Sequence, residues 1–194
     1  MEAKKKKELI LKTAKDVFSL YGYKKTTVED IADAMNMTKS NLYFYVKSKQ
    51  DLYDQVVRIA LDEWFGRVSD SLEGVEDLRE RFRLLATNAY TYLNEDDKLA
   101  KIILKDTSIL TYVLHEDKYS DVNMRSCEMI VSIIDEGIEK GVFRDIDSKV
   151  TADFFFTLYI MLLRKTFLRH DTEEGTAMFR QALELLMYGL IIPE

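Results

Sequence analysis

Residues 37–52, MTKSNLYFYVKSKQDL, combine hydroxyl, amide, phenol and ammonium groups around one expected helix start. Thr38 can cap a helix through its side-chain oxygen, which leaves Lys39, Ser40 and Asn41 in a polar first turn. Small polar side chains beside the free N–H groups of a helix N-terminus can bond phosphate oxygens and base edges. This stretch therefore predicts that the protein binds a polyanion.

Aromatic and basic residues follow this turn. Tyr43 and Tyr45 carry hydroxyls that can bond phosphate oxygens, and Lys47 and Lys49 lie at the expected start of the next helix, where they could meet the same phosphate backbone. Leu42 would pin the short helix to its neighbours. Taken singly, each residue also suits an ordinary packing role. The caps, the tight turn and the flanking lysines are more specific together than any one of them.

Helices must position these residues. The spacing of apolar residues predicts a first helix from about Lys4 to Leu20, which Gly22 would stop. Its apolar stripe consists of Ile10, Ala14, Val17, Phe18 and Tyr21.

A second short helix, VEDIADAM, is expected to begin after the cap residue Thr27, with Asp30 three residues further on. Asn36 should end it, because asparagine tolerates the left-handed backbone conformation. Thr38 then caps the third helix after a short turn. Two short helices joined in this way form the helix-turn-helix pattern.

The remainder of the chain is also expected to be helical. One proline and seven glycines in 194 residues leave few helix breakers. Ser48 caps a fourth helix that continues to about Val68, and the break at residues 139–147, EKGVFRDID, contains the stop residue Gly141. The sequence thus predicts an all-α fold of about nine helices. The five helices after Gly74 are expected near residues 76–94, 98–114, 119–140, 148–169 and 173–191.

The net charge of −6 conceals an asymmetry between the two ends of the chain. Residues 1–50 hold 11 lysines and six acidic residues, a net charge of +5. Residues 51–194 hold 17 basic and 28 acidic residues, a net charge of −11. A positive end on an acidic remainder predicts that the N-terminal part alone meets a polyanion.

Other functional classes have little support. There is no G-x-S-x-G motif and no glycine-rich phosphate loop, and His115 and His170 are the two histidines, so an enzyme is not expected. His115, Glu116 and Asp117 are adjacent and do not share a helix face, so neither a metal site nor another cofactor is expected. The single Cys127 suits a small buried residue in a reducing cytoplasm. The longest apolar block, residues 154–163, is too short to span a membrane.

The stretch TTVEDIADAMNMTKSNLYFYVKSKQDLY (26–53) resembles the DNA-binding region of TetR-type transcriptional repressors, whose pattern is roughly T-T-x-x-x-I-A-x-x-A-G-V-S-x-G-x-L-Y-x-H-F-x-x-K-x-x-L. The positions that match or nearly match are Thr26, Thr27, Ile31, Ala32, Thr38, Leu42, Tyr43, Lys49 and Leu52. The positions that depart from it are Met35, Asn36, Met37, Ser40, Tyr45 and Val46. Tyr45 keeps a hydrogen-bonding aromatic side chain where the family commonly has histidine, and Ser40 adds a hydroxyl at the groove.

The resemblance implies a cytoplasmic homodimeric repressor that binds a palindromic double-stranded DNA operator and is released by a small-molecule inducer. It implies a helix-turn-helix domain at residues 1–48 and a ligand-binding and dimerisation domain at residues 49–194. The residues expected to contact DNA are Thr27, Thr38, Lys39, Ser40, Asn41, Tyr43, Tyr45, Lys47 and Lys49. The residues expected to line an inducer pocket, most of which could equally be plain core, are Trp64, Phe65, Phe82, Tyr90, Tyr112, Met124 and Met129.

The last two expected helices, residues 148–169 and 173–191, would pair with their counterparts in a second copy. The sequence VTADFFFTLYIMLLRKTFL is apolar nearly all the way around, and such a helix is buried on several sides. A homodimer interface would cover the second side, although a central helix of a monomer would do so as well. The expected interface residues are Phe155, Tyr159, Leu162, Leu163, Phe179, Leu183 and Leu186.

Two alternatives remain open. A helical protein–protein adaptor with a basic N-terminal head would keep the remaining helices but would not need the capped turn with flanking lysines. A membrane-surface protein could use the basic first helix. The apolar stripe of that helix is short, however, and is needed for packing against the other helices.

Overall fold

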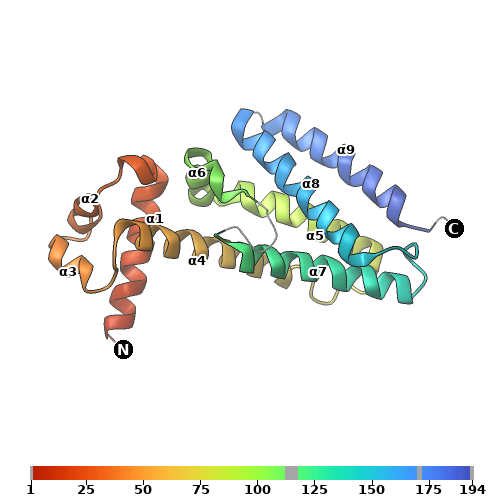
Figure 1. Ribbon diagram of the computed structural model, residues 1–194, viewed down its shortest axis with the longest axis horizontal. Coiled ribbons are helices and arrows are strands. Elements are labelled where there is room, and N and C mark those ends of the chain that lie inside the picture. Colours follow the sequence, from red (N-terminus) through yellow and green to blue (C-terminus); the bar gives the residue numbers. More distant parts are fainter. Residues whose placement is uncertain (1, 112–117, 170–171, 193–194) are drawn as a thin grey trace. The chain divides into compact units, whose positions relative to one another are not determined.

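The computed structural model describes residues 2–111, 118–169 and 172–192, and the predicted all-α fold is confirmed there (Figure 1). Within these ranges the chain forms nine α-helices and a short 3-10 helix, with one isolated β-bridge between Phe143 and Ile191. The elements are α1 (Glu2–Lys25), α2 (Val28–Asp33), α3 (Lys39–Tyr43), α4 (Lys49–Asp70), α5 (Leu78–Glu95), α6 (Asp97–Lys105), η1 (Thr107–Ile109), α7 (Ser120–Glu139), α8 (Ser148–Arg169) and α9 (Thr172–Leu190).

The chain separates into two compact units. The first, here called the head unit, consists of Met1–Glu63 and Glu95–Asp106. The second, the body unit, consists of Trp64–Asn94 and Thr107–Glu194. The division between the units therefore falls inside α4, and α6 belongs with α1–α3. The functional division into residues 1–48 and 49–194 stays a prediction.

The core of the head unit forms around α1. Ile10, Ala14 and Phe18 are fully buried, as their helical spacing predicts, but Tyr21 was wrongly expected to face inward and is 57% exposed. Helical geometry breaks at Gly22, which has a φ of 77°. The predicted stop is therefore found as a break inside α1, and one further turn carries the helix to Lys25.

The break at Gly22 receives a side chain from α6. The aliphatic part of Lys105 lies against Gly22, and its Nζ donates a hydrogen bond of 2.8 Å to the carbonyl oxygen of Ser19. Lys15 of α1 forms an ion pair of 3.0 Å with Asp96, the residue that caps α6. The helix expected over residues 98–114 is wrong in its length, because α6 ends at Lys105 and the chain continues as η1.

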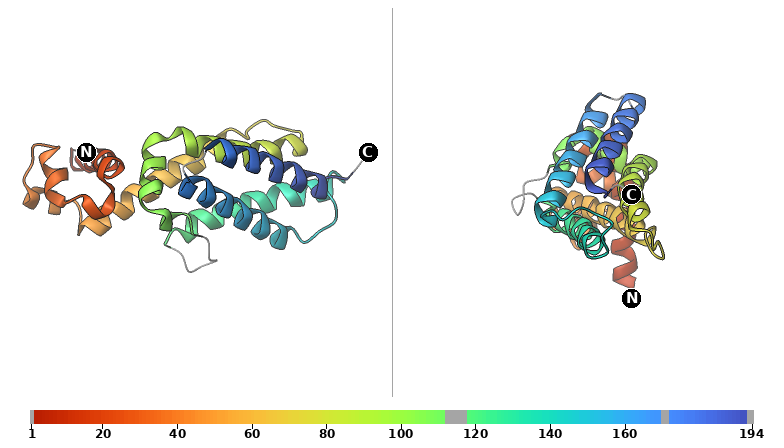
Figure 2. Two further views of the ribbon diagram at one scale, coloured as in Figure 1. Left: turned by 90° about the horizontal axis from the view of Figure 1, so that it is seen from above. Right: turned by 90° about the vertical axis from the view of Figure 1, so that its right-hand side faces the viewer.

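The body unit is a layered arrangement of helices around a buried apolar interior. Helix α8 packs between α7 and α9, and the neighbouring helices run side by side in both views of Figure 2. Gly141, with a φ of 68°, follows the end of α7 as predicted. The backbone N–H of Ile192 donates to the carbonyl of Val142, which anchors the end of α9 to the turn between α7 and α8. No helix in the described ranges is long and apolar enough to cross a bilayer.

Candidate nucleic-acid interface and body cavity

Helix α2 begins with a reciprocal cap. The N–H of Asp30 donates to Thr27 Oγ1 at 3.1 Å, and the N–H of Thr27 donates to Asp30 Oδ2 at 2.7 Å. This capping box satisfies two backbone donors that the helix itself cannot. The turn after α2 passes through Asn36, whose φ of 50° is the left-handed conformation that its side chain was predicted to tolerate.

Helix α3 exposes its first turn, as predicted. Thr38 Oγ1 accepts a hydrogen bond of 3.2 Å from the N–H of Asn41, which fixes the start of the helix. Leu42 is fully buried and holds α3 against the head unit. The side chains of Lys39, Ser40 and Asn41 are exposed, so their polar groups face solvent. The arrangement leaves small donors and acceptors free at a helix N-terminus, where the helix dipole favours anions.

An ion pair joins α3 to α2. Lys39 Nζ lies 2.5 Å from Glu29 Oε1, and both side chains are about half exposed. The hydrogen bond between them lowers the pKa of Glu29 and raises the pKa of Lys39. Both groups are therefore charged at neutral pH. Because the pair is exposed, a phosphate can compete with Glu29 for the ammonium group of Lys39.

Lys47 and Lys49, which were both expected to contact phosphates, differ in their surroundings. Lys49 Nζ donates hydrogen bonds of 2.9 Å to the carbonyl oxygens of Tyr23 and Thr26, and it lies 4.3 Å from the centroid of the Tyr23 ring. It thus satisfies carbonyls at the end of α1. Lys47, by contrast, has an exposed side chain just before α4. A phosphate contact by either lysine stays a prediction, but the Lys49 ammonium already has three partners within the head unit.

One exposed residue escaped the sequence analysis. Phe44, at the C-terminal end of α3, is 84% exposed, beside the exposed ring of Tyr43 and the half-buried ring of Tyr45. Its position could have been found from register, because Leu42 and Val46 are both buried and the residue between them must point away. A large exposed ring at the end of this helix can make apolar contact with a thymine methyl group or a sugar.

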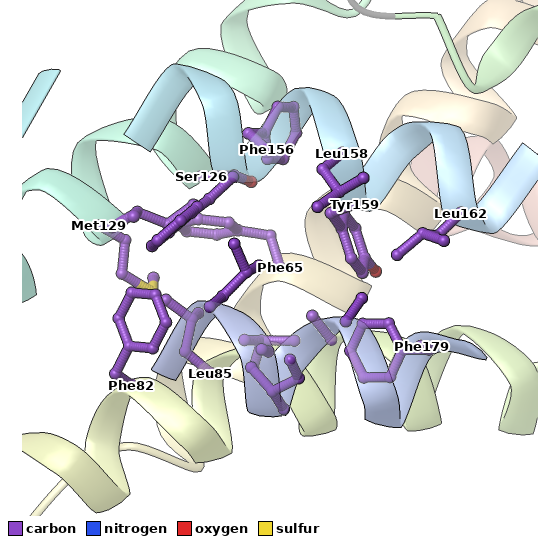
Figure 3. Close-up of a pocket in the computed structure, with 18 of the residues that line it drawn as sticks. Phe65, Phe82, Leu85, Ser126, Met129, Phe156, Leu158, Tyr159, Leu162 and Phe179 are labelled. Carbon is purple, nitrogen blue, oxygen red and sulfur yellow. The ribbon is translucent and has the colours of Figure 1, made fainter. Parts of the chain in front are cut away.

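The body unit contains an apolar cavity of about 80 Å³, several times the ~10–15 Å³ that one water molecule needs (Figure 3). The cavity is lined by residues from the end of α4 and from α5, α7, α8 and α9. Four of the residues expected at an inducer pocket line it: Trp64, Phe65, Phe82 and Met129.

The other expected pocket residues lie elsewhere. Tyr90 is buried and stacks on Phe179, a cavity residue, with ring centroids 4.4 Å apart. Met124 lines a separate surface groove between α7 and α8. Tyr112 lies outside the described residues, as do His115, Glu116, Asp117 and His170.

The residues expected at a dimer interface face the interior of their own subunit. Six of them line the cavity, and the seventh, Leu163, is buried. The six are Phe155, Tyr159, Leu162, Phe179, Leu183 and Leu186. The apolar side chains that α8 and α9 leave exposed are a different set: Val150, Phe154, Met161, Leu185 and Tyr188. The sequence alone could not distinguish the two sides of α8, because both are apolar.

Known proteins share this combination of head and body. The family described as "Bacterial regulatory proteins, tetR family" matches residues 10–56. The HTH-type transcriptional repressor KstR2 of Rhodococcus jostii (strain RHA1) is 27% identical over 146 residues, which are 75% of this chain and 72% of that protein.

Solved structures are similar over nearly the whole chain. A TetR-family transcriptional regulator from Pectobacterium atrosepticum has a TM-score of 0.79 and 26% identity, and the match covers 99% of this chain and 97% of that one. The regulator FadR from Bacillus subtilis, solved in complex with stearoyl-CoA, has a TM-score of 0.75 and 20% identity. The match covers 93% of this chain and 97% of that one, and at this identity it shows a shared fold only.

The chain matches the tetR family of bacterial regulatory proteins over residues 10–56 and is similar to regulators of that family over most of its length. It is a DNA-binding transcriptional regulator and not an enzyme.

Proposed function

We propose that the protein is a repressor that binds a two-fold symmetric DNA operator as a homodimer and releases it when a small molecule occupies the body cavity. The observation that carries the DNA-binding part is the exposed, polar first turn of α3, fixed by the Thr38 cap and the buried Leu42. In a helix-turn-helix the second helix enters the major groove by this end. KstR2, which is similar over most of the chain, is a named repressor.

The DNA-facing surface consists of side chains with complementary roles. Ser40 and Asn41 can reach base edges, while Lys39 and Lys47 supply positive charge for phosphates. Tyr43 and Phe44 add exposed aromatic surface at the other end of α3. The caps at Thr27 and Thr38 hold this surface in place, and their own oxygens are already occupied by backbone N–H groups.

The second copy of the chain is the partner proposed for the exposed faces of α8 and α9. On α8, Val150, Phe154 and Met161 recur at four- and seven-residue steps, which makes one stripe along the helix. On α9, Leu185 and Tyr188 are three residues apart. Exposed apolar stripes on two adjacent helices are typical of a protein interface. A two-fold dimer then supplies two heads for two half-sites.

The ligand acts through a helix that both units share. Helix α4 begins in the head unit, and Trp64 and Phe65 near its other end line the cavity. A ligand in the cavity therefore touches the same continuous helix that follows the DNA-binding turn. Release requires that the ligand bind the conformation with low DNA affinity more tightly than the other, and the shift cannot exceed that difference. The structure of B. subtilis FadR in complex with stearoyl-CoA supports the use of this fold to bind a small molecule.

The experiment that tests the proposal compares two Ser→Glu variants. Ser40→Glu places a negative charge in the exposed first turn of α3 and should weaken duplex binding more than about tenfold, since like charges in an interface cost several kcal/mol. Ser132→Glu makes the same change at an exposed position of α7 and should leave binding unchanged. Fluorescence anisotropy of a labelled duplex at fixed salt measures both. Equal binding by the parent and Ser40→Glu would contradict the proposed surface.

A further inference from the structure

The cavity in the body unit has few polar atoms, and most of them are already partnered. Trp64 Nε1 donates a hydrogen bond of 2.9 Å to the carbonyl oxygen of Ala89. The hydroxyl of Ser126 donates to the carbonyl oxygen of Val122 at 3.1 Å. Both polar groups therefore already donate to carbonyl oxygens of the protein's own backbone. They do not need a ligand.

Tyr159 differs from both. Its hydroxyl oxygen is buried and has no hydrogen-bond partner among the described residues. The ring projects from α8 toward Phe179 of α9, with the hydroxyl at the end nearer α9 (Figure 3). A buried hydroxyl without a partner is costly, so such a group in a native structure calls for a partner that comes from outside the chain.

The protonation state of Tyr159 indicates which kind of hydrogen-bonding partner its hydroxyl lacks. Burial, with a smaller effect from the nearby Tyr90, raises the pKa of the Tyr159 phenol well above its usual range. The hydroxyl thus keeps its proton at any physiological pH and acts as a donor. Because the O–H is an unused donor, an acceptor such as a carbonyl, ester, ether or hydroxyl oxygen would satisfy it.

The lining of the cavity also limits the charge of the ligand. No Lys, Arg, His, Asp or Glu is among the described residues that line it. An ionised group would lose its hydration there without gaining a counter-ion, and one phenol cannot compensate for that loss. A buried water molecule is a poor alternative partner, because it needs two to four polar neighbours and the partnered groups of Trp64 and Ser126 offer little.

We propose that the cavity binds an uncharged, largely apolar small molecule with one oxygen acceptor, which takes a hydrogen bond from the Tyr159 hydroxyl. This inference rests on the proposed function, since it names the chemical class of the releasing ligand. Tyr159 is the specificity-determining residue: the aromatic and aliphatic lining binds the body of the molecule, and the hydroxyl selects molecules with an acceptor.

Three probes of equal chain length test the proposal. 2-Octanone carries a neutral acceptor, octanoate carries a charge, and octane has neither. Trp64 is the only tryptophan of the chain and lines the cavity, so its fluorescence reports occupancy directly. We expect 2-octanone to bind at least about tenfold more tightly than octanoate. Tyr159→Phe should weaken 2-octanone binding about three- to tenfold and change octane binding less than about twofold.

A matched variant separates the hydroxyl from general packing. The Tyr90 hydroxyl is already bonded to Thr176 Oγ1 at 3.3 Å, and both tyrosines contact Phe179. Tyr90→Phe should therefore leave the preference for 2-octanone over octane intact. If Tyr159→Phe binds all three probes as the parent does, the assignment of Tyr159 is wrong. If octanoate binds as tightly as 2-octanone, the proposal that the cavity selects an uncharged ligand is wrong.

Parallel anisotropy measurements with labelled duplex keep the two proposals apart. If the probes enter the cavity and release DNA equally well from the parent and from Tyr159→Phe, this inference is wrong. The proposed function would still stand. Probes that bind as expected but never change DNA affinity would overturn ligand release and leave the assignment of Tyr159 standing. Absence of any change in Trp64 fluorescence with all three probes would overturn both.

Discussion

At the scale of single residues, Lys47 and Lys49 show how two similar side chains can have different roles. The Lys49 ammonium bonds two carbonyl oxygens at the end of α1, so Lys49→Ala should lower the free energy of unfolding by about 1–2 kcal/mol. Thermal unfolding followed by circular dichroism measures this loss. An unchanged midpoint for Lys49→Ala would mean that the two hydrogen bonds contribute nothing in solution.

Lys47→Ala is the contrasting change. Its side chain is exposed, so stability should stay within about 0.5 kcal/mol of the parent. If Lys47 contacts a phosphate, its removal should reduce the slope of log binding constant against log salt by about 0.9 per bound chain. A salt titration of duplex binding gives that slope, and a slope equal to that of the parent would remove Lys47 from the interface.

Substitutions of the cavity residue Tyr159 and of the neighbouring Tyr90 should have opposite effects on stability. Tyr159→Phe removes a buried hydroxyl without a partner among the described residues and should raise the free energy of unfolding of the ligand-free protein by about 1 kcal/mol. Tyr90→Phe removes a bonded hydroxyl and should lower it by about 1 kcal/mol. Chemical denaturation of both variants checks the signs. A loss of stability in Tyr159→Phe would indicate that its hydroxyl finds a partner in solution.

At the scale of elements, the capped turn is the part of the site that the sequence predicts best. Caps at Thr27 and Thr38 are local features, since each involves residues at most three positions apart. The inward faces of α8 and α9 could not be predicted in this way. Which side of an all-apolar helix meets α5 and α7 depends on tertiary packing, so Phe155, Leu162 and Leu183 were expected at an interface and line the cavity instead.

The length of α6 illustrates the same limit. Apolar residues continue past Lys105, and their spacing suggested one helix through residue 114. The chain instead leaves α6 at Asp106, whose N–H still bonds the carbonyls of Ile102 and Ile103, and the Tyr53 hydroxyl bonds the Asp106 carboxylate. That contact spans 53 positions in the sequence, so no local pattern could have indicated it.

Asn36 provides a test of the turn between α2 and α3. Its side chain is exposed and its φ is 50°, so a substitution there acts mainly through the backbone. Asn36→Val should lower the free energy of unfolding by about 1–2 kcal/mol, because a β-branched residue resists this conformation. Asn36→Gly should change it by less than about 1 kcal/mol. Equal unfolding midpoints for the two variants would show that the turn can rearrange without cost.

At the scale of the whole molecule, the exposed stripes of α8 and α9 carry the prediction of a dimer. Leu185 is 65% exposed and Met161 is 58% exposed, so Met161→Glu with Leu185→Glu should not disturb the core of one subunit. The double variant should be monomeric by sedimentation and should keep its helical circular dichroism. Gln181→Glu, a charge change at an exposed position of α9, should leave the dimer intact.

The double variant also has a consequence for DNA binding. A single head makes half of the contacts, so operator affinity should fall far more than it does for any one head substitution. A parent protein that sediments as a monomer at micromolar concentration would remove the basis for both expectations. A double variant that remains dimeric would move the interface to another surface.

Selection of bound duplexes from a random pool tests the central claim most directly, because it reports DNA binding and the symmetry of the assembly in one result. The account predicts enrichment of a two-fold symmetric sequence with half-sites spaced for two α3 helices, about one helical turn of DNA apart or a multiple of it. A pool that shows no enrichment at low salt, or an enriched site without two-fold symmetry that one chain occupies alone, would contradict it.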